Sequence, residues 1–243
     1  MSVITAIDHV HAQSSAVRRR VAEALAIIEV ALAQSRKPYI AYSGGKDSLV
    51  LTWLVHSIRD DVPLAWTDDE LEYPEVVDHM AALSHVAGDQ MMIKRGTHEH
   101  AGWFTPWSER PYFREPLPGT TDTGMSVDDW MAACGYDLVF TGLRGEESRR
   151  RRDWLRQSGP LYRVTAAVPW HCTPLADWGE HDIWALIARE RLPYSAVYDR
   201  LDEIDVARER MRVGPLPLAH REHLAAGWPD LLARMEARYG PRW

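Results

Sequence analysis

Hydrophobic residues recur every three or four positions near the start of the chain. Within residues 16–35 they are Val17, Val21, Leu25, Ile28 and Leu32. This spacing puts the five side chains on one face of a helix, so the pattern predicts an amphipathic helix that ends before Pro38. We expect residues 1–36 to form an N-terminal helical segment.

Short apolar runs alternate with helical patterns through the middle of the chain. The runs predict strands at residues 39–42, 62–67, 90–94 and 137–141. The intervening and later patterns predict helices at residues 46–58, 74–87, 126–133, 179–191 and 220–239. This alternation is typical of an α/β fold with an open, mostly parallel sheet and helices on both faces. The last helix belongs to a C-terminal helical appendage.

The first predicted strand leads directly into a loop that suits an anion. Residues 43–48 read Ser-Gly-Gly-Lys-Asp-Ser, and the next predicted helix begins within them. Paired glycines let the backbone turn tightly, while the unpaired amides and positive dipole end of the helix attract a negative group. The spacing is not that of a Walker A motif, which has four residues between its first Gly and its Gly-Lys pair.

Two further polar clusters lie where predicted strands end. Residues 67–70 read Thr-Asp-Asp-Glu, and residues 141–152 contain five arginines. In an open parallel sheet, ligands bind beyond the carboxyl ends of the strands, and guanidinium groups pair well with phosphate or sulfate oxygens. The alternatives are a solvated acidic turn for the first cluster and a solvated face or a nucleic-acid contact for the second.

These motifs resemble those of one superfamily. The loop at residues 43–48 is similar to the Ser-Gly-Gly-x-Asp-Ser loop of the PP-loop ATP pyrophosphatases, which include phosphoadenosine phosphosulfate (PAPS) reductases and the smaller subunit of sulfate adenylyltransferase. The turn at Asp68 resembles the Asp-Thr-Gly segment of PAPS reductases. Residues 142–151 resemble their Gly-x-Arg-x-x-Glu-Ser-x-x-Arg segment, which is also seen in sulfurtransferase-like enzymes of DNA phosphorothioation.

A fourth segment extends the resemblance toward the C-terminal part of the chain. Residues 174–184 look like the Pro-Leu-x-Asp-Trp-x-x-x-Asp-[Ile/Val]-Trp segment of the same family, and Leu192-Pro193-Tyr194 and Tyr198-Asp199 follow. We interpret this segment as structural, because Ile183, Trp184 and Ile187 form a buried stripe on a helix. The resemblance then spans residues 37–199, which we expect to form an adenine nucleotide alpha hydrolase-like domain, followed by a tail at residues 200–243.

The resemblance implies a set of nucleotide-binding residues. They are Ser43, Gly44, Gly45, Lys46, Asp47, Ser48, Asp68, Gly142, Arg144 and Arg151, with Arg150 in place of Arg151 if the register slips by one. Asp69 is the next candidate after Asp68 for a nucleotide contact. Of the set, Lys46, Asp47, Ser48 and Arg144 are expected to act in catalysis.

The activity that the resemblance implies is adenylyl transfer. The loop would bind the terminal phosphates of ATP with Mg²⁺, and a substrate oxygen would attack the α-phosphorus and release pyrophosphate. The hypothesis we favour is that this adenylyl transfer is the activating step of a sulfur-transfer pathway. Two alternatives remain, a reductase-like protein that binds PAPS or adenylylsulfate and a non-catalytic nucleotide-binding subunit of a complex. The first alternative needs a thiolate near the C-terminus, and no cysteine follows Cys172.

Composition narrows the picture further. With 243 residues, 46% hydrophobic and 26% charged, the chain is long enough for one α/β domain with an appendage, and its net charge of −7 argues against a surface built wholly for nucleic acid. Two cysteines are too few for a disulfide framework, and His98, His100 and His171 give no tetrahedral zinc spacing, so no metal ligands are assigned. No signal peptide or membrane span is predicted. We therefore expect a cytoplasmic protein whose partners are a nucleotide, an acceptor substrate and a partner protein or a second copy.

One long segment has an unusual composition. Residues 96–124 are rich in Pro, Gly and Thr, and Trp103, Phe104 and Trp107 lie close together within them. A loop of this length in a compact domain is usually functional or mobile. We expect its aromatic residues to form a lid that packs on the domain, with stacking on a nucleobase as the alternative.

Overall fold

A computed structural model describes residues 2–68, 70–96, 114–211, 213–214, 216 and 219–240. Several of the expectations above fall on other residues. Asp69, the two histidines His98 and His100, and the aromatic residues of the long loop from Trp103 to Trp107 lie outside the described part of the chain.

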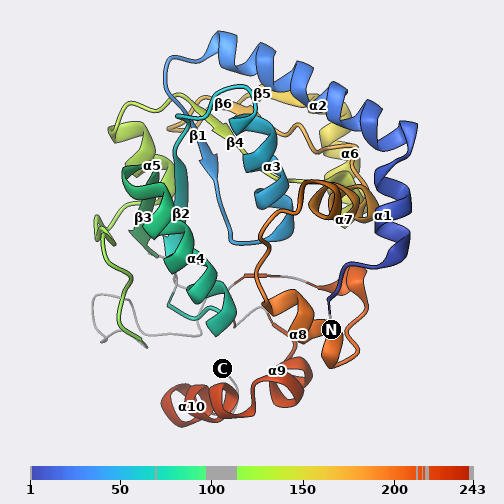
Figure 1. Cartoon of the computed structure of the whole chain (residues 1–243). Helices are drawn as coiled ribbons and strands as arrows, with labels where there is room; N and C mark the ends of the chain where they lie inside the picture. Colours follow the sequence, from blue (N-terminus) through green and yellow to red (C-terminus); the bar gives the residue numbers. More distant parts are fainter. Residues whose placement is uncertain are drawn as a thin grey trace.

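A six-stranded sheet runs through the middle of the described chain (Figure 1). Its strands are β1 Pro38–Ala41, β2 Leu64–Asp68, β3 Met91–Arg95, β4 Leu138–Phe140, β5 Leu161–Arg163 and β6 Trp170–Cys172. The strand order is β3-β2-β1-β4-β6-β5, and only β5 runs antiparallel to its neighbour. The mostly parallel sheet is therefore confirmed, and the hairpin of β5 and β6 adds two strands that the sequence pattern did not predict.

Helices follow most of the predicted positions. They are α1 Ala6–Ala12, α2 Ser15–Gln34, α3 Lys46–His56, α4 Pro74–Ala87, α5 Val127–Ala133, α6 Arg149–Ser158, α7 Glu180–Glu190, α8 Val197–Glu203, α9 Arg221–Gly227 and α10 Pro229–Tyr239, with short 3-10 turns at Gly88–Gln90, Gly145–Glu147 and Arg208–Arg210. The single helix expected at residues 220–239 is interrupted at Trp228, because the residue before a proline is displaced from helical geometry.

Side chains on alternate strand positions pack against helices on opposite faces. Ile40, Leu64 and Phe140 join the large core cluster formed with α2, α3, α4 and α7. Tyr39, Ala65 and Val139 point the other way and pack with the apolar side of α5. This period of two is the expected result of strand geometry, and it confirms that helices cover both faces of the sheet.

The strand order places the phosphate-loop candidate at a change of direction. From β1 the chain proceeds outward through β2 to β3, and then returns to the other side of β1 as β4. Because β1 pairs in parallel with β4, the loops that follow these two strands leave the same edge of the sheet side by side. A crevice between such loops is where open α/β sheets bind ligands.

The segments before β1 and after α7 pack on each other at one end of the molecule. The backbone N–H of Val3 donates to Asp199 of α8 at 2.7 Å, and the buried Asp8 pairs with Arg208 at 3.0 Å. In Figure 1 the N-terminus accordingly lies beside α8, with α9 and α10 below it. The expected boundary at residue 199 falls inside α8.

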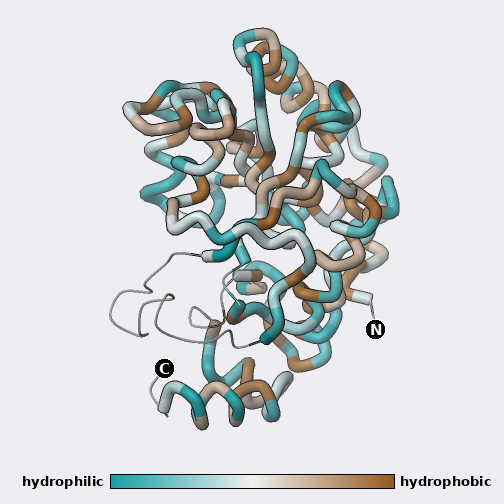
Figure 2. Tube along the Cα trace, turned by 90° about the vertical axis from the view of Figure 1, so that its left-hand side faces the viewer, coloured by the Kyte–Doolittle hydropathy of each residue, from teal (hydrophilic) through white to brown (hydrophobic). Residues whose placement is uncertain are grey.

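An aromatic residue between the last two helices helps to attach them to the rest of the fold. Trp228 is 4% exposed, packs against the tilted ring of Tyr73 with centroids 4.6 Å apart, and donates its indole N–H to Glu75 at 2.9 Å. Hydrophobic and hydrophilic positions alternate along α10, at the bottom of Figure 2, so this helix keeps one apolar side for the core. Among the described helices, none combines the length and apolar character that crossing a membrane requires.

Candidate functional site

The loop after β1 turns sharply and then starts α3. Gly44 has φ +75°, and a Cβ on it would lie 3.0 Å from Val76, so only glycine fits without strain. Ser48 donates its hydroxyl to the Gly45 carbonyl at 2.9 Å, and its oxygen lies 3.2 Å from the hydroxyl of Ser43. Gly45 is the N-cap of α3 and has no side chain to bond the amides of the first helical turn. The loop thus has the form of an anion cradle.

The loop after β4 lies in close contact with this cradle. A Cβ on Gly142 would lie 3.1 Å from the carbonyl carbon of Asp47 and 3.2 Å from the amide nitrogen of Ser48. The chain can follow this path only because residue 142 has no side chain. Gly142 therefore brings the second motif against the first turn of α3, at the place where the sequence expectation put it.

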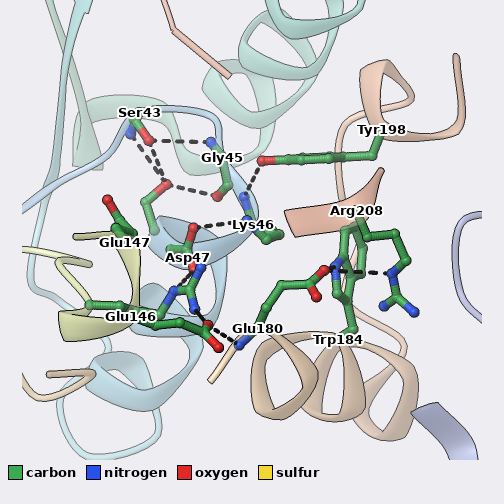
Figure 3. A network of polar contacts seen from close by, with 12 residues as sticks. Ser43, Gly45, Lys46, Asp47, Glu146, Glu147, Glu180, Trp184, Tyr198 and Arg208 are labelled. Carbon is green, nitrogen blue, oxygen red and sulfur yellow. Dashed lines mark hydrogen bonds and ion pairs between the residues drawn. The ribbon is translucent and has the colours of Figure 1, made fainter. Parts of the chain in front are cut away.

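Arg144 is buried and paired with carboxylates. Its side chain is 2% exposed, its Nε lies 2.6 Å from Asp47 Oδ1, and its Nη1 donates to Glu146 at 2.6 Å. Burial alone would lower the pKa of Arg144, but the attraction of Asp47 and then Glu146 outweighs it and raises the pKa. The same Asp47 carboxylate accepts from Lys46 Nζ at 3.2 Å, so it stands between two cations (Figure 3).

A cavity of about 370 Å³ opens beside the two loops. Its walls come from both predicted motifs and from later parts of the chain. The lining residues are Ala41, Ser43, Gly45, Lys46, Asp47, Ser48, Thr141, Gly142, Leu143, Glu147, Arg151, Tyr198, Met211 and Val213. A second, more apolar cavity of about 220 Å³ shares Ala41 and Ser43 with it and extends toward Trp66 and Val127. We call the first the polar cavity, because its wall contains Lys46, Asp47, Glu147 and Arg151, and the second the apolar cavity; the two adjoin at the carboxyl edge of the sheet.

The two arginines of the uncertain register differ in position. Arg151 lines the polar cavity and forms an ion pair with Glu147, whereas Arg150 is exposed to solvent at the start of α6 and does not line the cavity. Ser148 is the N-cap of α6, and its hydroxyl accepts from the backbone N–H of Arg151 at 3.1 Å. The geometry therefore favours the register with Arg151.

Asp68 occupies a different setting from the one expected. It is fully buried at the end of β2, where Oδ1 accepts from Arg114 at 2.5 Å and from the backbone N–H of Glu70 at 2.9 Å. It does not line either cavity formed by the described residues. Glu72, two residues past the turn, lines the apolar cavity instead.

Several cavity residues were not predicted from the sequence. Tyr198 of α8 accepts a hydrogen bond from the backbone N–H of Lys46 at 2.9 Å, and Met211 and Val213 reach the cavity from beyond α8. Tyr198 belongs to the Tyr-Asp pair noted in the family resemblance, which was the one available signal. Met211 and Val213 have no motif around them.

Neither cysteine is placed for attack on a ligand in this cavity. Cys172 is buried in β6, and burial raises the pKa of its thiol. Cys134 is exposed where α5 ends, and its carbonyl accepts from Lys37, which precedes β1. Cys134 therefore lies at the opposite edge of the sheet from the loops.

Comparison with known proteins fits this geometry. The family model of the phosphoadenosine phosphosulfate reductase domain matches residues 37–202, which include both loops and Tyr198. The chain belongs to this family. The match confirms the resemblance that the motifs indicated, and it extends three residues past the expected end of the domain.

Curated relatives that resemble this chain along most of its length are named sulfate adenylyltransferase subunit 2. The sulfate adenylyltransferase subunit 2 of Myxococcus xanthus is 26% identical over 88% of this chain and 80% of its own length. The subunit 2 of Rhizobium meliloti is 24% identical over 81% of this chain and 72% of its own length.

Solved structures share the fold at lower identity. The PAPS reductase of Candida auris, in a phosphate complex, superposes with a TM-score of 0.54 at 15% identity, covering 83% of this chain and 95% of that one. The FMN adenylyltransferase of Candida glabrata in complex with ATP has a TM-score of 0.54 at 13% identity, covering 79% of this chain and 64% of that one. These likenesses confirm the adenine nucleotide alpha hydrolase-like fold.

Proposed function

We propose that the protein binds ATP at the crevice between the loops and transfers AMP to an oxygen of an acceptor, with release of pyrophosphate. The observation that carries the proposal is the cavity in which the first turn of α3, Lys46 and Arg151 face one space. Two cationic side chains and a helix N-terminus stabilise a leaving pyrophosphate, whose negative charge grows as the bond to the α-phosphorus breaks. The adjoining apolar cavity beside Trp66 suits the adenine ring.

The residues of the loop divide this work. Lys46 is 2% exposed and supplies a point charge to the phosphates, while the Ser43 and Ser48 hydroxyls fix the shape of the turn. Arg144 is not assigned a direct contact with the phosphates, because it pairs with the carboxylates of Asp47 and Glu146. Asp47 also pairs with Lys46 and so connects the two cations. We assign Arg144 and Asp47 to holding Lys46 in place.

Magnesium fits this site as a companion of the phosphates. The described residues offer no group of three His, Cys, Asp or Glu side chains that could hold a metal ion. Mg²⁺ commonly binds through substrate phosphates and one or two carboxylates, and Asp47 and Glu147 line the polar cavity. Bound there, Mg²⁺ would neutralise phosphate charge during the reaction.

The names of the relatives support one acceptor in particular. Subunit 2 of a sulfate adenylyltransferase acts on sulfate within an assembly, so sulfate is the first acceptor to test and a second protein chain is the proposed partner. Reduction of a sulfonucleotide by either cysteine is disfavoured, since Cys172 is buried and Cys134 lies at the far edge.

The test follows the bond that is cleaved. ATP labelled in its α-phosphate is incubated with Mg²⁺ and sulfate, and the products are separated. Adenylyl transfer gives labelled AMP or adenylylsulfate with pyrophosphate, whereas cleavage at the terminal phosphate gives ADP. Ser48→Ala removes the hydroxyl that donates to the Gly45 carbonyl and fixes the turn, and we expect a loss of about 10²-fold in product formation, as for a misplaced binding loop.

The matched control is Ser57→Ala at the other end of α3, where the hydroxyl donates to the Leu54 carbonyl at 2.7 Å. This variant should keep the full rate. Equal rates in the two serine variants, or ADP as the nucleotide product, would contradict the proposal. PAPS added as a competitor separates the sulfonucleotide alternative, which requires PAPS to bind more tightly than ATP.

A further inference from the structure

A tyrosine hydroxyl lies at the N-terminus of the helix that follows the phosphate-loop candidate. Lys46 is the first residue of α3, and its backbone N–H donates to the Tyr198 hydroxyl at 2.9 Å. Tyr198 is 2% exposed, yet it forms part of the wall of the polar cavity. The hydroxyl therefore reaches the space where the helix dipole and the loop amides attract an anion.

The ring of Tyr198 is fixed by its neighbours. It meets Trp184 edge-on at 5.3 Å and 88°, and Tyr194 at 6.4 Å. Trp184 in turn donates its indole N–H to Glu180 at 2.6 Å, and Arg208 stacks over the Trp184 ring at 5.2 Å. Because the ring is packed on several sides, the hydroxyl has a fixed position when a ligand enters the cavity.

The packing of Tyr198 is connected to the loop by a second route. The backbone N–H of Glu180 donates to Glu146 at 2.6 Å, Glu146 accepts from Arg144, and Arg144 pairs with Asp47 beside Lys46. Figure 3 shows this chain of contacts between the loop at one side and Tyr198, Trp184 and Arg208 at the other. The hydroxyl and the loop are thus held in one framework at two points.

The chemistry of a phenol suits this position. A hydroxyl accepts one hydrogen bond and donates another at the same time, and accepting from an amide makes it a stronger donor. A phosphate oxygen is an acceptor only. We propose that Tyr198 is a nucleotide-binding residue whose hydroxyl accepts from the Lys46 amide and donates to an oxygen of the terminal phosphates. This inference rests on the proposed function only in placing a polyphosphate at the loop.

The consequence is a dependence on the length of the phosphate chain. The hydroxyl bonds to the first amide of α3 in the wall of the polar cavity, whereas the adjoining apolar cavity, proposed for the base, does not include Tyr198 in its wall. A ligand with β- and γ-phosphates or free pyrophosphate reaches Tyr198, whereas the single phosphate of AMP stays closer to the base. Tyr198 should therefore contribute to binding of ATP and pyrophosphate and not to binding of AMP.

The experiment measures dissociation constants by titration calorimetry for pyrophosphate, ATP and AMP. Tyr198→Phe keeps the ring and removes the hydroxyl. We expect the dissociation constants of pyrophosphate and ATP to rise about tenfold or more, as for loss of a hydrogen bond to a charged group, and that of AMP to stay unchanged. Tyr194→Phe is the matched control, because its hydroxyl belongs to the same aromatic cluster but bonds to Asp199 and Ser2.

The outcomes separate the inference from the proposed function. Equal pyrophosphate affinity in the wild type and Tyr198→Phe overturns the inference, as does an equal loss of affinity for AMP. A wild-type protein that binds pyrophosphate but never cleaves ATP contradicts the proposed function while leaving this test intact. A wild-type protein that binds no pyrophosphate overturns both.

A second variant keeps the donor role testable if Tyr198→Phe fails to fold. A fluorinated tyrosine at position 198 keeps the ring and its packing and is a stronger hydrogen-bond donor, so pyrophosphate should bind about twofold tighter at mildly acidic pH. The same replacement at position 194 should change nothing. Weaker or unchanged pyrophosphate binding with the fluorinated residue at 198 refutes the donor role.

Discussion

The close approach of Gly142 to α3 allows a quantitative prediction. In Gly142→Ala the new methyl carbon would lie 3.1 Å from the Asp47 carbonyl carbon and 3.2 Å from the Asp47 oxygen and the Ser48 nitrogen. These neighbours are backbone atoms, and the shortest distance lies about 0.3 Å inside ordinary van der Waals contact. One of the two loops must move, since no flexible side chain is available to yield.

The cost should appear in stability and in function together. Overpacking of this kind costs about 1–3 kcal/mol, so the free energy of unfolding in urea should fall by that amount. The displacement falls on the first turn of α3, where Lys46 and Ser48 line the cavity. Pyrophosphate affinity and adenylyl transfer should therefore fall by about 10- to 100-fold, as positional errors below 1 Å do in catalytic sites.

Gly179→Ala is the control, because a Cβ there would lie 3.6 Å from Asp182 and 3.8 Å from Glu146, both side-chain atoms at ordinary contact distance. We expect unchanged pyrophosphate affinity and a loss of about 0.5–1 kcal/mol at the helix cap, where glycine is preferred over alanine. A Gly142→Ala protein with normal unfolding and normal pyrophosphate affinity would refute the reasoning that residue 142 sets the distance between the loops.

Two further predictions address the arginine register and acid stability. Arg151→Ala should weaken pyrophosphate binding about tenfold, because of the two arginines only Arg151 lines the cavity, and Arg150→Ala should leave the binding unchanged. Calorimetry measures both dissociation constants. A larger loss in Arg150→Ala would instead support the motif alignment that uses Arg150. Burial alone would raise the pKa of Asp8, but hydrogen bonds from Arg208 and Thr5 outweigh it and lower the pKa. The ionised Asp8 carboxylate therefore stabilises the fold above about pH 4, and this contribution to the free energy of unfolding is lost as the pH falls further. Asp8→Asn should lower stability at pH 7 and flatten the acid limb of the unfolding curve, and an acid limb identical to the wild type would contradict this.

The sequence could predict the sheet and the loops because their signals are local. The Gly-Gly turn, the apolar runs before it and after it, and the proline at the start of α4 each determine backbone geometry within a few residues. The parallel order then follows from helical crossovers, which brings the ends of β1 and β4 together. Gly142 and Arg144 were expected at the site because they follow a predicted strand and match the Gly-x-Arg segment of the family.

Other parts of the site depend on contacts between distant residues. Tyr198 is 152 positions from Lys46, and no periodicity in either segment indicates that the two meet. The ion pair of Arg144 with Asp47 also joins residues that are far apart in the sequence, so the motif alone predicted an anion ligand where the structure shows a buried ion pair. The strands β5 and β6 have three residues each, too short for an alternating pattern to be recognised.

The contact of the N-terminal segment with α8 has a practical consequence for anyone who prepares the protein. Val3 is 1% exposed and its amide is bonded to Asp199, the neighbour of Tyr198, while the Ser2 hydroxyl lies 3.0 Å from that of Tyr194. An affinity tag joined directly before these residues would compete with the docking of Val3 and shift the aromatic cluster beneath the crevice. Binding measurements are therefore best made with a cleavable tag or a long spacer, and a difference in pyrophosphate affinity between tagged and cleaved protein would report on this coupling.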